Sequence, residues 1–281
     1  MHSLGILGVG ELTEKVVIGL RRSGFDGAIL LSPRNAQRAE ALAHTQGCQV
    51  LPSNQAVVDQ AELVMLGVRP AALAQLASEV RLRPGQRLLS LAAGVGLAQL
   101  QAAFPAAHCV RVMLSYAAQH NQATVVVCPP DVPTEQGLGA LGNLVVLQDE
   151  AAFELATVAA CMNGWFYFLL HDLQHWLVDK GLPADQARTL VLGNLQDCLA
   201  SARANPEQTL KAMGEAIATP GTFTAAGLDV LHHQPGSATW GAACEVVFDA
   251  LTKGEIRPDT IYPVSEFAWR TGGAPSRTSR S

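Results

Sequence analysis

Short apolar runs alternate with amphipathic stretches in the first half of the chain. Six runs predict strands: Leu4–Val9, Gly27–Leu31, Leu63–Val68, Arg87–Leu91, Val110–Leu114 and Thr124–Val127. The runs at Leu4 and Leu63 are nearly continuous in apolar residues, as in strands that are covered on both faces. The stretches between the runs have a helical period, as in Glu14–Arg22, Ala36–Gln46, Pro70–Val80 and Leu97–Ala103. Alternating strands and helices predict βαβ units and a mostly parallel sheet.

The second half of the chain has a different pattern. From about Ala151 the hydrophobic period is helical and no strand signal recurs. The expected helices are Ala151–Leu177, Ala184–Ala204, Pro206–Ala218, Thr222–His233 and Ser237–Lys253. Charge is sparse on these helices, so we expect them to be buried on more than one face, in part against a second subunit. The last residues, Thr271–Ser281, are rich in Gly, Ser and Arg and are expected to be disordered.

These patterns predict an α/β N-terminal Rossmann-like domain followed by an all-α C-terminal domain. We place the first domain at residues 1–152, the second at 153–270 and a tail at 271–281. A length of 281 residues fits two domains. Charged residues make up only 15% of the chain, which leaves little charge to cover a large monomer surface and favours a homo-oligomer.

Composition also limits the partners and the compartment. The net charge is −5 and no basic block stands out, so neither nucleic acid nor an anionic membrane surface is expected. The most apolar stretch, Ala156–Leu170, is too short to span a membrane, and no secretory signal is apparent. The 6 cysteines form no C-x-x-C pair, which argues against a zinc site or a disulfide framework. A reducing cytoplasm is the simplest setting.

A glycine turn follows the first predicted strand. Gly8-Val9-Gly10 lies between that strand and a helical stretch, which is the place of a dinucleotide-binding turn. The first glycine permits the tight turn, and the second lets the backbone approach a pyrophosphate. The helix start, with Glu11 and Leu12, offers unpaired N–H groups. Thr13 replaces the third glycine of G-x-G-x-x-G, so the local motif also fits a purely structural βα turn.

The end of the second predicted strand indicates the preferred nicotinamide cofactor. Ser32-Pro33-Arg34 contains no carboxylate, which an NAD site would use to bind the ribose 2′-hydroxyl. A hydroxyl and a guanidinium suit a 2′-phosphate, so we expect NADPH; an ordinary solvated loop is the alternative. Two later strand ends complete the expected cofactor site. They are Val68-Arg69-Pro70, where the proline is also an ordinary first helical residue, and Ala93-Gly94, where small residues would admit a nicotinamide ring.

The order of these elements resembles the pyrroline-5-carboxylate reductase family, over nearly the whole chain from about Leu4 to Ala250. Besides the glycine turn, the matching N-terminal segments are Ser32-Pro33-Arg34, Asn54, Val68-Arg69-Pro70, Ala92-Ala93-Gly94 and Val110-Arg111-Val112-Met113. The resemblance implies a Rossmann domain, an all-α dimerisation domain, and an approach of Asn54 to the adenosine ribose.

The substrate site is implied by a second matching segment. Thr219-Pro220-Gly221-Thr222-Phe223-Thr224 resembles the family's Ser-Pro-Gly-Gly-x-Thr segment. In the family, the first hydroxyl and the last threonine hold the substrate carboxylate and the imine nitrogen. The resemblance therefore implies that Thr219, Pro220, Gly221 and Thr222 bind substrate and that Thr224 faces the reacting nitrogen. Thr219 is also a good helix N-cap before Pro220, and the two roles can coexist.

Three segments depart from the family pattern. Met113-Leu114-Ser115, followed by Tyr116, replaces Met-Pro-Asn, and Trp165-Phe166-Tyr167 replaces Pro-Ala-Tyr. Within the third, Thr222 replaces a glycine and Phe223 replaces a small residue. We expect this added bulk close to the substrate pocket, although repacking of a core is the alternative. The leading prediction is an NADPH-dependent reductase of a cyclic imine, most simply pyrroline-5-carboxylate in proline biosynthesis.

Two other functions stay open. A β-hydroxyacid-type dehydrogenase shares the two-domain plan but needs an interdomain lysine, and neither Lys180 nor Lys211 lies in a G-x-x-G-x-x-K pattern. A family member that binds the cofactor but has lost the chemistry would act as a sensor or partner protein. His171 and His175 can share a helix face, but H-E-x-x-H is absent and no metal is expected.

Overall fold

The computed structural model describes residues 1–233 and 236–253. The chain forms two compact units, Met1–Thr219 and Pro220–Ser281. The predicted domain boundary at residue 152 stays a prediction, because compactness alone divides the chain further on. The predicted tail, residues 271–281, lies outside the described residues.

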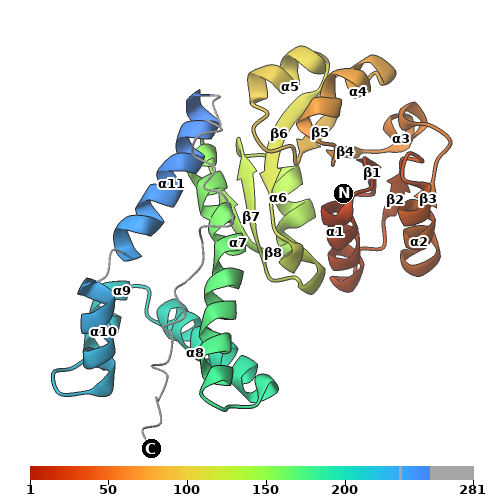
Figure 1. The fold of residues 1–281 in the computed structure, drawn as a ribbon. Helices are drawn as coiled ribbons and strands as arrows, with labels where there is room; N and C mark the ends of the chain where they lie inside the picture. Colours follow the sequence, from red (N-terminus) through yellow and green to blue (C-terminus); the bar gives the residue numbers. More distant parts are fainter. Residues whose placement is uncertain (234–235, 254–281) are drawn as a thin grey trace, which may run out of the picture. The chain divides into compact units, whose positions relative to one another are not determined.

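An eight-stranded sheet forms the centre of the first unit, in the order β3-β2-β1-β4-β5-β6-β7-β8 (Figure 1). The strands are β1 (Ser3–Leu7), β2 (Ala28–Leu31), β3 (Gln49–Val50), β4 (Leu63–Leu66), β5 (Arg87–Ser90), β6 (His108–Met113), β7 (Ala123–Cys128) and β8 (Gly142–Val146). Neighbouring strands are parallel except for β6 and β7, so the predicted mostly parallel sheet is confirmed.

All six predicted strands are present, and β3 and β8 are additional. The strand β3 has only 2 residues, too few to give a pattern. The strand β8 lies at the edge of the sheet with its middle residues exposed, so it lacks the burial that would mark it. The strand order reverses between β1 and β4. In an open α/β sheet such a switch point opens a crevice beyond the carboxyl ends of the strands.

Helices cover both faces of the sheet. On one face α1 (Glu11–Arg22) and α2 (Ala36–Gln46) pack on a core that includes Ile6, Leu31 and Met65. The other face is covered by α3 (Asn54–Gln60), α4 (Leu73–Glu79) and α5 (Leu97–Ala103). The short elements are η1 (Pro70–Ala72), η2 (Tyr116–His120), α6 (Val132–Leu138) and η3 (Gly139–Leu141). The result is a three-layer α/β/α sandwich, as expected for a Rossmann-like domain.

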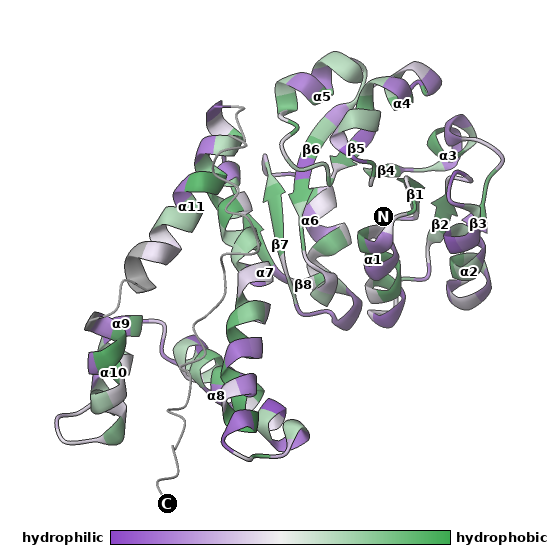
Figure 2. Ribbon diagram, viewed as in Figure 1, coloured by the Kyte–Doolittle hydropathy of each residue, from purple (hydrophilic) through white to green (hydrophobic). Residues whose placement is uncertain are grey.

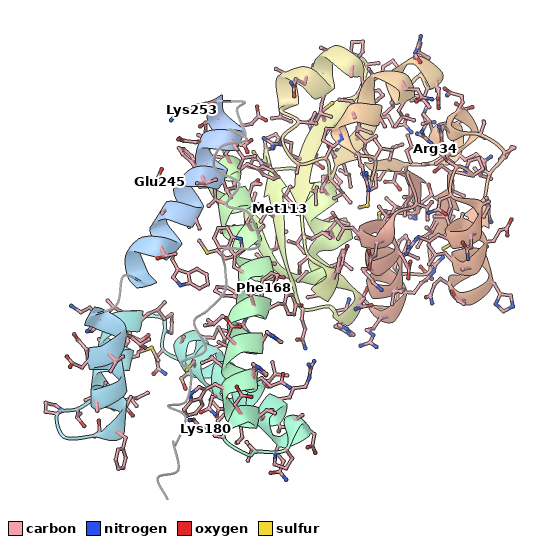
Figure 3. All side chains as sticks on the ribbon, viewed as in Figure 1. Arg34, Met113, Phe168, Lys180, Glu245 and Lys253 are labelled. Carbon is pink, nitrogen blue, oxygen red and sulfur yellow. The ribbon has the colours of Figure 1, made fainter. Side chains whose placement is uncertain are left out.

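Three helices complete the first unit: α7 (Glu150–Asp179), α8 (Ala184–Ala204) and α9 (Leu210–Ile217). The start of α7 packs on the sheet through Phe153, which is 4% exposed. Further along, α7 carries exposed apolar side chains such as Phe168, labelled in Figure 3, and its apolar stretch is visible in Figure 2. These side chains are exposed in the single chain, so the expected burial of the helices on more than one face, in part against a second subunit, stays a prediction.

The length of α7 changes one expectation. The stretch Ala156–Leu170 is part of a 30-residue helix, and α7 is long and apolar enough to cross a membrane by length and composition. One such helix among the described residues is weak evidence. The packing of its first turns on β7 and of its later turns on α8 accounts for part of its apolar character.

The described part of the second unit consists of α10 (Phe223–His233) and α11 (Gly236–Lys253). Both helices were predicted within one residue of these bounds. The predicted helix over Pro206–Ala218 is shorter in the structure, since α9 begins only at Leu210. Thr209 is its N-cap, because the hydroxyl accepts a hydrogen bond from the Ala212 N–H at 3.1 Å.

Candidate functional site

The two glycines of the Gly8-Val9-Gly10 turn differ in what requires them. Gly8 has φ +94°, and a Cβ there would lie 2.7 Å from Val68 Cγ1, so the fold itself demands glycine. Gly10 has φ −99°, which any residue adopts, and the nearest atom to a Cβ would be the Gly67 carbonyl oxygen at 3.9 Å. Nothing in the packing of the described chain requires glycine at position 10, where Gly10 is the N-cap of α1, so the space beside its backbone is open to a ligand.

Thr13 performs a task that the sequence motif assigns to a third glycine. Its side chain is buried, and its hydroxyl lies 2.9 Å from the Gly10 N–H and 3.2 Å from the Gly8 carbonyl, so it closes the turn. The third glycine normally allows close packing of helix on strand. Here the room comes from Gly67 after β4, where a Cβ would lie 2.4 Å from Thr13 Cγ2. Thr13 is thus compatible with a dinucleotide turn.

The end of β2 holds the glycine turn from the other side. Ser32 is fully buried, and its hydroxyl accepts a hydrogen bond from the Gly8 N–H at 3.0 Å. The Asn35 side-chain amide donates to the Val9 carbonyl at 3.0 Å. Between them Arg34 is exposed (Figure 3), so its guanidinium is accessible to a ligand beside the turn. The sequence did not identify Asn35, although asparagine before a helix is a common loop residue.

The helix N-terminus that follows the turn carries Glu11 and Leu12. Glu11 is exposed in the first turn of α1, where the positive end of the helix dipole stabilises its negative charge. Burial and a hydrogen bond with the Glu11 carboxylate raise the pKa of the Tyr116 hydroxyl. The ring of Tyr116, 49% exposed, thus lies beside the glycine turn. Tyr116, which follows the segment that departs from the family pattern, therefore lies next to the turn where the cofactor is expected.

Two loops at the carboxyl ends of β4 and β5 contain other predicted site residues. After β4, Val68 is half-buried, while Arg69 and Pro70 are exposed, with Pro70 as the first residue of η1. After β5, Ala93 and Gly94 are exposed at a loop tip where Gly94 has φ +70°. These positions share the edge of the sheet with the glycine turn.

Asn54 has a partner of its own. It is half-buried at the start of α3, directly after the N-cap Ser53, and its side-chain amide donates to Glu79 Oε2 at 2.7 Å. An approach of Asn54 to a ribose therefore stays a prediction.

The segment Thr219–Thr224 runs from the end of the first unit into the second. Gly221 has φ +86° with open space around a Cβ. The Thr222 hydroxyl accepts a hydrogen bond from the Ala225 N–H at 3.1 Å, so Thr222 is the N-cap of α10. The sequence placed this N-cap three residues earlier, at Thr219. Thr224 is exposed in the first turn of α10, and Phe223 beside it is 99% exposed.

An apolar groove of about 650 Å³ runs between α7 and α8. The side chains that line it are almost all apolar, among them Phe166, Leu169, Leu173, Trp176, Leu190 and Leu195. Phe166, Leu173 and Trp176 are each more than 40% exposed, which is unusual for a lone soluble chain and typical of an association surface. Phe166, whose ring was expected close to the substrate pocket, therefore lines this groove.

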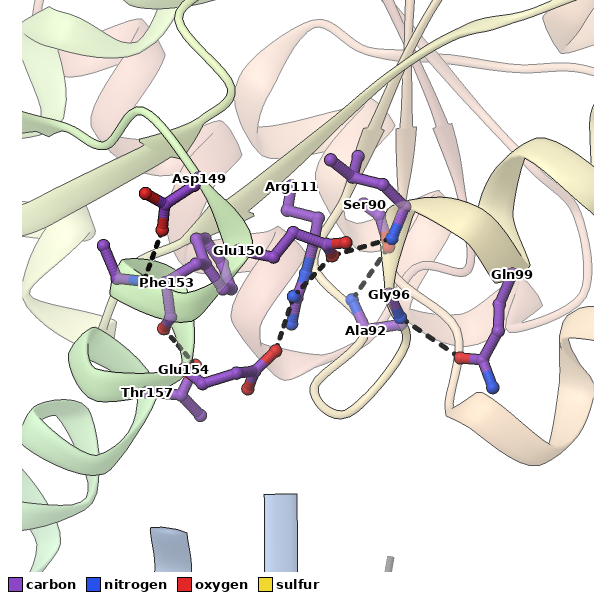
Figure 4. A network of polar contacts seen from close by, with 12 residues as sticks. Ser90, Ala92, Gly96, Gln99, Arg111, Asp149, Glu150, Phe153, Glu154 and Thr157 are labelled. Atoms are coloured by element: carbon purple, nitrogen blue, oxygen red, sulfur yellow. Dashed lines mark hydrogen bonds and ion pairs between the residues drawn. The ribbon is translucent and has the colours of Figure 1, made fainter. Parts of the chain in front are cut away.

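A buried ion-pair network was not identified as functional from the sequence. Arg111 on β6 contacts Glu150 and Glu154 at the start of α7 (Figure 4). The signal that could have revealed it is an arginine in the middle of the apolar strand Val110–Leu114. The described residues hold no cluster of three or more His, Cys, Asp or Glu side chains placed for a metal.

The fold and the glycine turn define the class of this protein: a chain with an N-terminal Rossmann-like domain and a C-terminal helical region. A sequence model described as NADP oxidoreductase coenzyme F420-dependent matches residues 3–94. A second, described as pyrroline-5-carboxylate reductase dimerisation, matches residues 150–253. Together with the relatives below, these matches support an oxidoreductase that is similar to the pyrroline-5-carboxylate reductases.

The known pyrroline-5-carboxylate reductases that resemble this chain are distant in sequence. The pyrroline-5-carboxylate reductase of Haemophilus influenzae is 25% identical over 243 residues, which are 82% of this chain and 89% of that protein. The Streptococcus pyogenes enzyme superposes with a TM-score of 0.77 at 23% identity, covering 89% of this chain and 98% of that one. A Plasmodium falciparum pyrroline carboxylate reductase with NADP bound gives 0.77 at 16% identity, covering 89% and 97%. At these identities the structures establish the fold alone.

Proposed function

We propose that this protein is an NADPH-dependent reductase of a cyclic imine, with pyrroline-5-carboxylate as the simplest substrate and proline as the product. The similarity to pyrroline-5-carboxylate reductases supports the reaction class. The observation that supports a working cofactor site is Gly10, a glycine that neither its backbone angles nor its neighbours require. A glycine at this position leaves the space beside the backbone empty, so that a pyrophosphate can approach it closely.

The residues around the turn fit the parts of the cofactor. The N–H groups at the start of α1 lack intrahelical acceptors and favour a diphosphate. Arg34 is exposed beside the turn and suits a 2′-phosphate, while buried Ser32 positions the turn through Gly8. When bound, a reduced nicotinamide supplies the hydride. The protein's own task is to orient the ring and the imine and to exclude water.

The substrate role is assigned to the start of α10. The Thr224 hydroxyl would donate a hydrogen bond to the imine nitrogen, and Thr219 with the backbone from Pro220 to Thr222 would hold the carboxylate. A cyclic iminium already carries its positive charge, so a hydroxyl that orients it is sufficient and no strong acid is needed. The first residues of a helix also favour a carboxylate, since their N–H groups point toward it.

A second copy of the chain is the proposed cover for the groove between α7 and α8. Its exposed apolar side chains, including Leu173 and Trp176, would be buried in a homodimer. Five cysteines of the described chain are free thiols: Cys48, Cys109, Cys128, Cys198 and Cys244. Burial raises the pKa of the Cys48 and Cys109 thiols to about 11, which keeps them protonated and unreactive. Free thiols agree with the expected cytoplasmic setting.

No observation favours a β-hydroxyacid dehydrogenase. The two lysines weighed for its chemistry, Lys180 after α7 and Lys211 on α9, contact neighbours on the same stretch of chain. Lys180 Nζ lies 5.7 Å from the centroid of the Trp176 ring, and Lys211 Nζ lies 3.6 Å from Glu215 Oε1 with its side chain 84% exposed.

The direct test is turnover of L-pyrroline-5-carboxylate with NADPH, followed by the absorbance of the reduced cofactor. The proposal expects NADPH oxidation that depends on the imine and yields proline. Tight NADPH binding without turnover would refute the substrate and favour another imine or a sensor role. An absence of NADPH binding would refute the cofactor site itself.

Arg34→Ala is expected to weaken NADPH binding by about 10- to 100-fold, because a charge-assisted contact to a phosphate contributes about 1.5–3 kcal/mol. NADH binding should change less than about 3-fold, since NADH has no 2′-phosphate. Fluorescence titrations with both cofactors measure this difference. Arg22→Ala, which removes an exposed arginine at the far end of α1, is the matched control and should affect neither. Equal weakening of NADPH and NADH would contradict the assignment.

Thr224→Val removes a hydroxyl while keeping the side-chain shape, and we expect kcat to fall about 10-fold or more. The affinity for NADPH should stay unchanged, because the cofactor is assigned to the sheet. Thr224→Ser keeps the hydroxyl and should recover most of the turnover. Steady-state kinetics of the three proteins measure the effect, and an unchanged kcat for Thr224→Val would remove this hydroxyl from the site.

A further inference from the structure

The buried arginine Arg111 links three elements of the first unit. It lies on β6 with 1% of its surface exposed, and its Nη1 donates to Glu150 Oε1 at 2.9 Å and to Glu154 Oε1 at 2.6 Å. Both carboxylates belong to the first turns of α7 (Figure 4). The Arg111 guanidinium carbon also lies 4.1 Å from the centroid of the Phe153 ring, which fixes the plane of the guanidinium.

The carboxylate of Glu150 has a second contact, on the loop after β5. Its Oε1 accepts a hydrogen bond from the Leu97 N–H at 2.8 Å, the first N–H of α5. The same oxygen lies 3.4 Å from the place a Cβ on Gly96 would occupy. One carboxylate oxygen therefore joins Arg111 to the end of the loop formed by residues 91–96.

The beginning of this loop is fixed as well. Ser90 is the strand partner of Arg111 in the β5–β6 ladder, and its hydroxyl accepts from the Ala92 N–H at 3.3 Å. Ala92 and Val95 are buried, 7% and 4% exposed. Only the tip, with Ala93 and Gly94, is exposed. The loop is thus held at both ends and presents a small, preformed tip at the edge of the sheet where the cofactor is expected.

Fold stability is a poor explanation for this network. Within the described chain, Arg111 Nε and Nη2 and Glu154 Oε2 are buried without a hydrogen-bond partner. Burial of a charge with incomplete hydrogen bonding is costly, and a buried ion pair often stabilises less than apolar side chains of the same size. Buried polar groups that are only partly satisfied call for a functional explanation.

We propose that Arg111 and Glu150 are positioning residues: they hold the loop of residues 91–96 so that its Ala93–Gly94 tip sets the orientation of the nicotinamide ring. This inference rests on the proposed function. Because the rest of the cofactor is bound elsewhere, a loosened loop affects hydride transfer more than affinity. A misplacement of about 1 Å is enough to slow such a step by about 100-fold.

The test compares Glu150→Ala with two matched variants. Glu150→Gln keeps an oxygen that can accept from both Arg111 and Leu97. Asp149→Ala removes the N-cap of the same helix, where Asp149 Oδ1 accepts from the Ala152 N–H at 2.8 Å without contacting the loop. Each protein is titrated with NADPH by nicotinamide fluorescence, assayed for kcat and KM with L-pyrroline-5-carboxylate, and melted by circular dichroism.

For Glu150→Ala we expect kcat to fall by about 10-fold or more while the KM for NADPH changes less than about 3-fold. The emission of bound nicotinamide should shift toward that of free NADPH. Glu150→Gln should restore turnover and emission, and Asp149→Ala should lower only the melting temperature.

An unchanged kcat and emission in Glu150→Ala, or an equal kcat loss in Asp149→Ala, would overturn the positioning role. Wild-type protein that binds NADPH without turnover would refute only the substrate, since the emission still reports on the loop. Wild-type protein that binds no NADPH would overturn both proposals.

Discussion

Arg111→Met is expected to lower the free energy of unfolding by about 3–5 kcal/mol, because it leaves the Glu154 carboxylate in a largely buried position without its cation. The Arg111 side chain is 2% exposed and the Glu154 side chain 18% exposed, so water replaces little of the lost contact. Methionine fills a similar volume, which limits any effect of a cavity. Urea unfolding followed by circular dichroism measures the change.

Two further variants separate charge from packing. Arg111→Met combined with Glu154→Met replaces both partners with apolar groups and should recover at least half of the lost stability. Arg87→Met on the neighbouring strand breaks the pair with Asp131, whose Oδ1 lies 3.1 Å from Arg87 Nε. The Asp131 side chain is only 6% exposed, but the Thr134 N–H and hydroxyl still donate to it at 3.0 and 2.6 Å, so that change should be smaller, about 2 kcal/mol or less. Equal losses for Arg111→Met and Arg87→Met would contradict the special status of the buried network.

Gly10→Ala is expected to weaken NADPH binding about 100-fold while lowering the free energy of unfolding by only about 1 kcal/mol, because Gly10 is the N-cap of α1 and alanine is a poorer cap. With φ at −99° and 3.9 Å of clearance, the backbone accepts an alanine without strain. The added methyl group would occupy the space that a pyrophosphate needs, and a 100-fold loss corresponds to about 2.7 kcal/mol of binding free energy. Fluorescence titration and thermal melting, done on the same preparation, separate the two effects.

The comparison with other glycines makes this prediction specific. Gly139→Ala introduces the same methyl group at φ −58° into open space and should change neither binding nor stability. Gly8→Ala should reduce both, since its φ of +94° and the 2.7 Å approach to Val68 strain the folded state. An NADPH affinity that survived Gly10→Ala would show that no ligand approaches this part of the turn.

Much of the fold could be predicted from local pattern. Continuous apolar runs such as the one at Leu63 mark strands buried on both faces, and the helical period from Ala151 onward marks the long helices. The bounds of α2 and α8 agree with their predictions residue by residue. The edge strand β8 could not be predicted in this way, because its exposed face gives no burial signal.

The candidate site could also be predicted from local pattern only in part. A glycine turn after the first strand and an arginine after the second are local features, and their positions could be read from spacing. The sequence could not reveal that Thr13 closes the turn, that Gly67 makes room for it, or that Ser32 faces the glycine backbone instead of solvent. Each of these contacts joins residues from different elements.

By itself the sequence determined the order and type of the elements, the mostly parallel sheet and the place of the dinucleotide turn, because hydrophobic period and glycine position are properties of neighbouring residues. Only the tertiary structure decided which of the two turn glycines the fold needs. It also decided that one arginine on β6 holds a loop after β5 through a carboxylate on α7. Such contacts depend on how distant segments meet in space, and no local pattern encodes that meeting.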